Sequence, residues 1–330
     1  MSESQEPSDS VPVAPSYSVP VAPSDSVPVA TAIPINEASI RLLALCRENK
    51  PCADIACHLA EHPQCLRSGV VDADGATPLH WLALHGNLES IRLLNIPDLL
   101  AVPVAKSEMQ PIHWACTHGH VNVVSHIVEQ VGPASMNVRD GRQTTPLMIS
   151  TQYRHHALMR WLTAHGADAS LEDQDGDTAM HWAAYKDDAT ALELLDALPG
   201  SPLDPTLPDN YGSNCLHLAA SMGGAAAAEW LLRRDERTVA GMLGALDAKG
   251  RTPVEVARQR GHAHVRRMLE YGPGPLEAVQ AWADEASAWW RSALQEWGQQ
   301  WEQQHAPEPP REMEMRVMQT AAMRPAEEIL

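Results

Sequence analysis

Residues Thr77-Pro78-Leu79-His80 are the first of six related four-residue blocks that recur along the chain. The others are Gln110-Pro111-Ile112-His113, Thr145-Pro146-Leu147-Met148, Thr178-Ala179-Met180-His181, Asn214-Cys215-Leu216-His217 and Thr252-Pro253-Val254-Glu255. Measured at the second residue of each block, successive blocks are 33, 35, 33, 36 and 38 residues apart. A recurrence at this period is typical of an array of similar supersecondary units.

The residue types of each block predict the start of a helix. Threonine is a good N-cap, and proline suits the first helical turn because no backbone donor is needed there. Leucine or another apolar residue then begins the buried stripe, and we expect the histidine to bridge turns of neighbouring units. Each block therefore predicts one helix, and six blocks predict six units.

The sequence around the blocks agrees with this interpretation. Asp-x-x-Gly turns precede four of them, at Asp72–Gly75, Asp173–Gly176, Asp209–Gly212 and Asp247–Gly250. Glycines that can end a helix follow four, at Gly86, Gly119, Gly223 and Gly261. Second helices are predicted at 91–94, 123–128 and 191–195. Together with the period, these features resemble ankyrin repeats over about residues 70–270.

This resemblance implies an all-α solenoid of helix-turn-helix repeats in which no single repeat buries its own apolar face. We expect a capping hairpin at 36–69, with helices at 38–46 and 53–60, before the repeats. The expected repeats are about 72–104, 105–138, 139–171, 172–206, 207–245 and 246–271. Residues 1–35 repeat a Ser-Asp-Ser-Val-Pro-Val-Ala-Pro pattern, which predicts a disordered or polyproline-II-like arm, and 306–330 are expected to be a disordered tail.

Residues 276–305 predict a C-terminal amphipathic helix rich in tryptophan. Its apolar stripe carries Trp282, Trp289, Trp290, Trp297 and Trp301 at helical spacing. Three roles are open: a cap folded back on the last repeat, a helix that docks on a partner or a second copy, and an anchor at a membrane interface. Five acidic residues against one arginine in this segment disfavour attraction to anionic lipid.

The charge of the chain narrows the classes of partner. Of its 330 residues 24 are basic and 42 acidic, so the net charge is −18. Such a chain lacks the basic surface that nucleic acid requires, and neutral or basic protein partners are favoured. The N-terminus has no basic and apolar leader, and no apolar run reaches a membrane-spanning length. Six cysteines then predict reduced thiols, and we expect a cytoplasmic or, alternatively, nuclear protein.

Enzyme and metal signatures are missing from the sequence. It contains no glycine-rich phosphate loop, no His-Glu-x-x-His and no Gly-x-Ser-x-Gly. Cys46, Cys52, Cys57 and Cys65 cluster, but their spacing lacks the short knuckles of zinc sites, and Cys46 and Cys57 are expected in the core of the hairpin. We therefore expect no catalytic residue, no metal and no cofactor.

Tryptophan follows the histidine in three blocks, at Trp81, Trp114 and Trp182. These indoles either pack between repeats or reach the groove of the array, where they would hold an extended, proline-containing peptide by stacking and an N–H bond. In the second case the partner-binding cluster is predicted to contain Trp81, His85, Trp114, Tyr153, Trp182 and Tyr185.

The His-Trp-Ala blocks, residues 175–186 and the last block look similar to the ankyrin domain of the Asp-His-His-Cys protein S-acyltransferases (palmitoyltransferases). That resemblance implies recruitment of unstructured peptides, with Trp114 at the tryptophan of the family's second repeat. The catalytic tetrapeptide and the membrane spans are missing here; the nearest motif is Arg154-His155-His156-Ala157. The sequence therefore favours a non-catalytic adaptor, with the substrate-recruiting part of a truncated S-acyltransferase as the alternative.

Overall fold

The computed structural model describes residues 37–67, 70–198 and 204–272. Within these ranges the chain is all helical, with α-helices, three short 3-10 helices and no β-strand, which confirms the expected fold class. The structure divides into two compact units. The first contains the described residues up to Gln174 together with 194–198, and the second contains 175–193 and 204–272.

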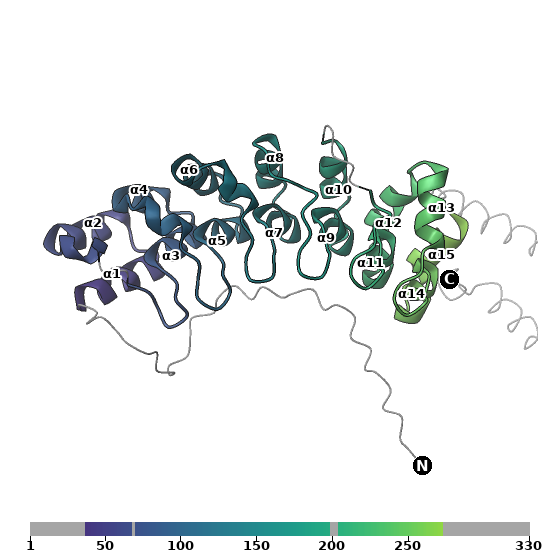
Figure 1. Ribbon diagram of the computed structural model, residues 1–330, viewed down its shortest axis with the longest axis horizontal. Helices are drawn as coiled ribbons and strands as arrows, with labels where there is room; N and C mark the ends of the chain where they lie inside the picture. Colours follow the sequence, from purple (N-terminus) through teal and green to yellow (C-terminus); the bar gives the residue numbers. More distant parts are fainter. Residues whose placement is uncertain (1–36, 68–69, 199–203, 273–330) are drawn as a thin grey trace, which may run out of the picture. The chain divides into compact units, whose positions relative to one another are not determined.

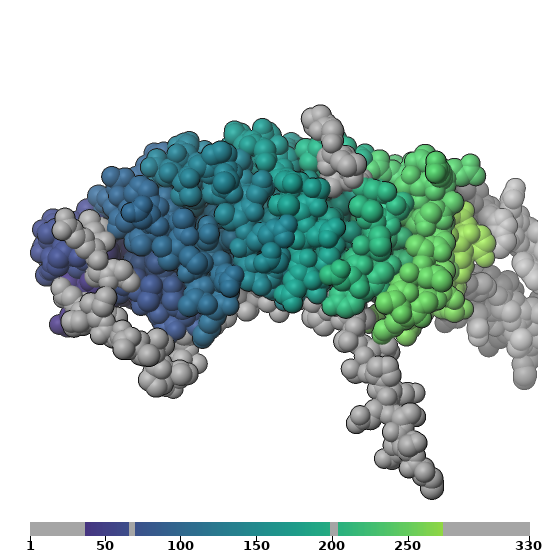
Figure 2. All heavy atoms as spheres, viewed as in Figure 1, coloured from purple at the N-terminus to yellow at the C-terminus, as the bar shows by residue number. Residues whose placement is uncertain are grey.

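The first unit is a stack of antiparallel helix pairs. Its helices are α1 (Glu37–Arg47), α2 (Cys52–Glu61), α3 (Pro78–His85), α4 (Leu88–Leu94), α5 (Pro111–Thr117), α6 (Val121–Val131), α7 (Pro146–Gln152) and α8 (His156–Ala164). The 3-10 helices are η1 (Pro63–Arg67), η2 (Pro97–Ala101) and η3 (Pro133–Asn137). Figure 1 shows α1, α3, α5 and α7 in one row and α2, α4, α6 and α8 in a second row. On the face that Figure 2 shows, the atoms of neighbouring pairs of this unit lie against one another.

The second unit contains α9 (Ala179–Tyr185), α11 (Cys215–Met222), α12 (Ala225–Leu232), α13 (Glu236–Gly244), α14 (Pro253–Arg260) and α15 (Ala263–Tyr271). Helix α10 (Ala189–Asp196) lies across the boundary of the two units in the sequence. Helix α11 contacts both α9 and α14. Helices α3, α5, α7, α9, α11 and α14 each begin at a block, and we call them block helices.

The block histidine joins its own helix to the turn of the following pair. His80 Nδ1 lies 3.1 Å from Thr77 N and accepts that backbone hydrogen, which completes a capping box with the N-cap threonine. Because Nδ1 is the acceptor, the proton of the neutral imidazole is on Nε2, and Nε2 donates to Met109 O at 3.1 Å. The predicted bridging role is confirmed.

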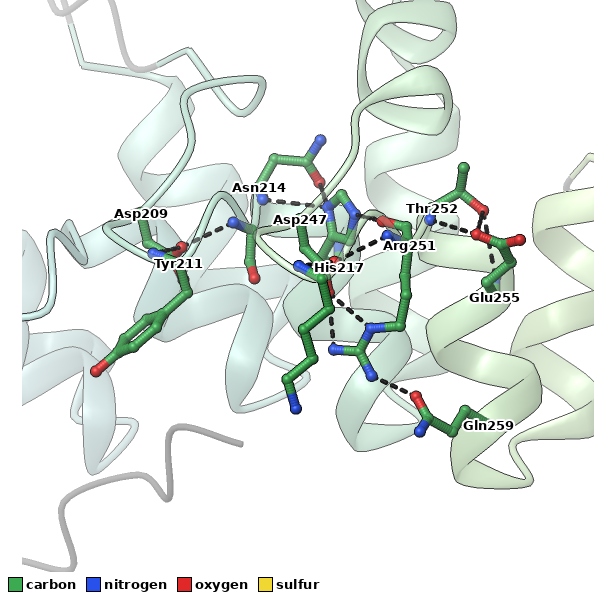
Figure 3. A network of polar contacts seen from close by, with 11 residues as sticks. Asp209, Tyr211, Asn214, His217, Asp247, Arg251, Thr252, Glu255 and Gln259 are labelled. Carbon is green, nitrogen blue, oxygen red and sulfur yellow. Dashed lines mark hydrogen bonds and ion pairs between the residues drawn. The ribbon is translucent and has the colours of Figure 1, made fainter. Parts of the chain in front are cut away.

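Three further block histidines repeat this arrangement. His113 donates to Val138 O at 3.3 Å, His181 to Leu207 O at 3.0 Å and His217 to Arg251 O at 3.0 Å. Figure 3 shows His217 between Asn214, which caps α11, and the turn that leads to α14. With His80, these four side chains are almost completely buried. Burial disfavours the charged imidazolium and lowers the pKa of all four, to about 4 for His80 and His181.

The aspartates of the turns hold the loops between helix pairs. Asp209 Oδ1 accepts from Tyr211 N at 2.8 Å and from Ser213 N at 2.7 Å. Asp247 Oδ1 accepts from the equivalent Lys249 N and Arg251 N, both at 2.9 Å (Figure 3). A carboxylate that accepts two backbone hydrogens closes the turn without a strand partner, so the Asp-x-x-Gly pattern marks a turn and needs no bound cation.

Glycine ends the block helices where the backbone turns left-handed. Gly86 has φ +71° and Gly261 has φ +78°, as predicted for helix-ending glycines. At Gly86 an added Cβ would lie 2.5 Å from His120 Nδ1, whereas at Gly261 nothing lies within 4 Å. Gly86 is therefore required both for its φ and for the approach of His120, whose Nε2 lies 2.9 Å from Leu84 O.

The free energy of unfolding is expected to fall as the pH drops from about 6.5 to about 4. In this window the unfolded chain protonates its histidines, while buried His80 and His181 stay neutral. Each of the two histidines should lower the free energy of unfolding by about 1.4 kcal/mol per pH unit in this window. Above the unfolded pKa of about 6.5 neither histidine lowers it. Urea unfolding across this range measures the slope. His181→Met, a side chain already present at Met148 of the third block, should make the slope shallower; an unchanged slope would contradict the neutral buried state.

Gly86→Ala should lower the free energy of unfolding by more than the cost of backbone strain at this position. Alanine in the left-handed region costs about 1 kcal/mol, and Gly261→Ala should show only this loss. At Gly86 the Cβ must also displace His120, which adds about 1 kcal/mol for its hydrogen bond to Leu84 O. In a His120→Ala background the extra loss should vanish, because the obstructing ring is gone. Chemical denaturation of the four proteins measures the cycle, and equal losses from Gly86→Ala in both backgrounds would refute the steric explanation.

Candidate functional site

Two of the three block tryptophans lie in the first unit and are buried. Trp81 and Trp114 each expose only 5% of their surface and meet edge to face, with ring centroids 5.1 Å apart. Trp81 Nε1 donates to Asp72 Oδ2 at 3.0 Å, so its N–H is used within the turn. The Arg47 guanidinium lies 5.5 Å from the Trp81 ring. The two indoles thus pack between consecutive helix pairs and fix the spacing of α3 and α5.

Trp182 has a similar environment in the second unit. It is 3% exposed and its ring meets Tyr185 edge to face at 5.8 Å. Tyr185 itself is partly exposed at the end of α9, and Lys186 Nζ lies 5.6 Å from its ring. Of the six residues predicted for a partner-binding cluster, the three tryptophans are therefore interior, while His85, Tyr153 and Tyr185 reach the surface.

Three surface residues of the first unit share one position of the repeating pattern. His85, His118 and Tyr153 lie at or just beyond the C-terminal ends of α3, α5 and α7. Each comes five residues after the last residue of its block and directly before the left-handed position that follows the helix. His118 is exposed, and His85 and Tyr153 are partly exposed. We call these three residues the histidine–tyrosine row. His118 was not among the predicted residues, although its place in the block pattern matches that of His85.

Two further imidazoles support this row. His120 Nε2 lies 2.9 Å from Leu84 O, and His155 Nε2 lies 2.9 Å from Thr117 O, so each ring reaches back to the preceding block helix. His118 stacks on His120 with centroids 5.9 Å apart, and Tyr153 stacks on His155 at 6.3 Å. Consecutive helix pairs are therefore joined by rings that also hold the exposed side chains in place.

The electrostatics at the middle of the row favour a neutral His118. Partial burial lowers the pKa of His118 and His120, and the neighbouring histidines lower it further. At neutral pH both rings are uncharged. His120 Nε2 already donates to Leu84 O and His118 Nδ1 lies 2.9 Å from Thr117 Oγ1, so Nε2 of His118 is the ring nitrogen that can bond a ligand. The row can therefore exchange hydrogen bonds and stack with a ligand without demanding a charged group.

The cysteines of the N-terminal hairpin do not form a single buried group. Cys46 is fully buried on α1, and burial raises the pKa of its thiol to about 12. The expectation for Cys57 is wrong, because Cys57 is exposed. It lies two residues after buried Ile55 on α2, and two residues rotate a helix by more than half a turn, to the solvent side. Among the described residues no three His, Cys, Asp or Glu side chains are placed to hold a metal ion.

Several predicted features lie outside the described residues. These are the N-terminal arm, the five tryptophans Trp282, Trp289, Trp290, Trp297 and Trp301 of the C-terminal segment, and the tail. In the part of the chain that the structure describes, no helix has the length and apolar character needed to cross a membrane.

Comparison with known proteins supports the pattern of blocks. A family model described as "Ankyrin repeats (3 copies)" matches residues 42–140 and 112–200. Human Inversin is 25% identical over 179 residues, which are 51% of this chain and 17% of Inversin. Canine Inversin is 26% identical over the same length. Human Ankyrin repeat domain-containing protein 63 is 28% identical over 146 residues, 43% of this chain and 37% of that protein.

The chain spans well under half the length of these curated relatives. The matched region contains the block helices α3, α5, α7 and α9, whereas α11, α14 and the Asp209 and Asp247 turns follow it in the sequence. The chain therefore carries ankyrin repeats, and its all-helical fold is that of an ankyrin-repeat solenoid.

Proposed function

We propose that the chain is a non-catalytic protein-interaction module, which binds an extended segment of a partner protein along the histidine–tyrosine row. The observation that carries the proposal is the alignment of His85, His118 and Tyr153 on three consecutive helix pairs, all at the surface. Residues at one repeat position on adjacent pairs offer an extended peptide a contact at regular intervals.

The support beneath the row gives it the rigidity that a binding surface needs. The Trp81–Trp114 pair packs below, and His120 and His155 tie each pair to the one before it. A ligand would meet side chains that are already ordered and would lose less conformational entropy on binding. The tryptophans of the predicted cluster would then act as a platform, and His85 and Tyr153 as contacts.

The chemistry of the row indicates the kind of segment it would receive. The imidazole and phenol rings offer ring faces together with hydrogen-bonding groups, which suits a segment with apolar or proline side chains and free backbone groups. The net charge of −18 disfavours an acidic partner. Tyr185 and Lys186 offer a second aromatic contact on the other unit. The six cysteines are present as thiols, which is consistent with a reducing compartment, and we place the protein in the cytoplasm, with the nucleus as the alternative.

His118→Ala combined with Tyr153→Ala should abolish most of the peptide binding. A random peptide library displayed on phage and selected on the full-length chain supplies defined ligands, and fluorescence polarisation of the enriched peptides measures their affinity. Loss of two stacking and hydrogen-bonding contacts should weaken binding by about tenfold or more. Because both side chains reach the surface, the melting temperature should stay close to that of the parent protein.

The control carries Arg92→Ala and Arg160→Ala, two exposed side chains on the second helices α4 and α8. It should bind the enriched peptides as the parent protein does. Peptides that bind the row variant and the parent protein equally well would place the binding surface elsewhere. A selection that enriches no peptide would contradict peptide recognition itself.

The alternative function is recruitment of substrates for an S-acyltransferase of which this chain would be one part. It rests on the His-Trp-Ala blocks, which place Trp114 and Trp182 after their histidines. Sequencing of the transcript beyond the codon for Leu330 tests it. Coding sequence for apolar spans and an Asp-His-His-Cys block would support this function, and a stop codon at that point would contradict it.

A further inference from the structure

The last helix pair, α14–α15, differs from the earlier pairs at the positions that normally face a following pair. The block histidine marks this side of the helix, because it donates to the next turn. Glu255 takes its place in α14 and is held within its own capping box, with Thr252 N 2.8 Å from Glu255 Oε2 (Figure 3). The last pair therefore lacks the side chain that bridges to a further repeat.

Three neighbouring positions change in the same way. In every earlier pair they are buried and apolar or small, whereas the last pair has partly exposed Val254, exposed Arg258 and partly exposed Arg266. The buried equivalents are Leu79, Ile112, Leu147, Met180 and Leu216 for the first position, Ala83, Cys116, Thr151, Ala184 and Ala220 for the second, and Ile91, Val124, Met159, Leu192 and Ala228 for the third. We call Val254, Glu255, Arg258 and Arg266 the end face.

The end face carries an arginine without a complete set of partners. Arg266 Nε is buried and has no hydrogen-bond partner among the described residues; Glu270 Oε1 forms an ion pair with it at 3.7 Å, which is beyond hydrogen-bond distance. A buried guanidinium nitrogen without an acceptor is costly. The two helices contain four arginines and two glutamates, so this end is basic on a chain of net charge −18. A carboxylate that accepts a hydrogen bond from Arg266 Nε would satisfy this end of the array.

The tryptophan-rich segment that follows α15 has the matching chemistry. It contains five acidic residues and one arginine between 276 and 304. On a helix Glu285 lies beside both Trp282, three residues before it, and Trp289, four residues after it. One face of the segment therefore offers two indoles and a carboxylate together. An arginine already packs on an indole elsewhere in the protein, because the Arg234 guanidinium lies 4.4 Å from the Trp230 ring.

The segment is also close enough to reach the end face. Helix α15 ends at Tyr271, which is 82% exposed, and Gly272 turns the chain with φ +85°. Four residues separate Tyr271 from Leu276, which allows up to roughly 16 Å of chain. A pair of helices presents a face about 20 Å across, and 18 helical residues extend about 27 Å, so the first part of the segment suffices to cover it.

We propose that residues 276–293 dock on the end face as an intramolecular cap, with Trp282 and Trp289 over Val254 and the arginine side chains and with Glu285 paired to Arg266. The cap covers the last pair and turns its own acidic face to solvent, which gives the array the polar outer end that keeps a solenoid soluble. Residues 297–304 extend beyond the face and are not part of the contact. This role is separate from the proposed partner-binding row.

Limited digestion of the full-length chain by trypsin tests the cap, with cleavage after Arg291 followed by mass spectrometry. Docking protects this bond, because a protease cleaves only the opened form. Trp282→Ala with Trp289→Ala should accelerate this cleavage by about tenfold or more, whereas the control, Trp297→Ala with Trp301→Ala, should leave it unchanged. The first variant alters only the segment, so the repeats remain able to fold.

Charge reversal identifies the partner of the segment. Arg258→Glu with Arg266→Glu should accelerate cleavage after Arg291, and adding Glu285→Arg should restore part of the protection. Equal cleavage in the parent protein and all variants would overturn the proposal. Protection that grows with protein concentration would also overturn it, because the occupant would then be a second copy of the chain.

Discussion

The structure depends on one interaction, the hydrogen-bonded bridge made by the buried block histidine. Its Nδ1 accepts from the N-cap residue and its Nε2 donates to the turn of the next pair. No single pair buries its own apolar face, so the contact that fixes one pair against the next decides whether the array forms. The bridge works only while the ring is neutral, because a protonated Nδ1 cannot accept. Burial supplies that condition by lowering the pKa.

The local pattern of the repeats could be predicted from sequence because it depends on short-range chemistry. Threonine and proline at the start of a block, glycine at its end and aspartate in the turn act within four residues. Exceptions occur where a residue other than glycine adopts the left-handed conformation that follows a block helix. Arg154 and Asp187 occupy the position of Gly86 with φ +59° and +54°, so the left-handed turn is kept without glycine. The added helices η2, η3 and α13 between pairs follow no block and were not predicted.

The candidate site was predicted less completely, because exposure is decided by neighbouring pairs and not by the local sequence. The spacing placed Trp81 and Trp114 correctly on α3 and α5, but only the packed structure shows that they are interior. His118 follows from the alignment of the blocks, whereas its stacking on His120 requires the three-dimensional turn. Cys57 illustrates the same limit, since a spacing consistent with the core also fits the solvent face of α2.

The same repeat positions distinguish the interior of the array from its end. Where a following pair is present, the bridging position is histidine or methionine and its neighbours are buried and apolar or small. At the last pair the bridging position is Glu255, and two of its three neighbours are Arg258 and Arg266. The most direct test of the histidine bridge is the protonation state of the block histidines, measured by nitrogen-15 NMR of the imidazole rings near pH 6. We predict that His80, His113, His181 and His217 are neutral with the proton on Nε2. Protonated rings, or neutral rings with the proton on Nδ1, would contradict the bridge.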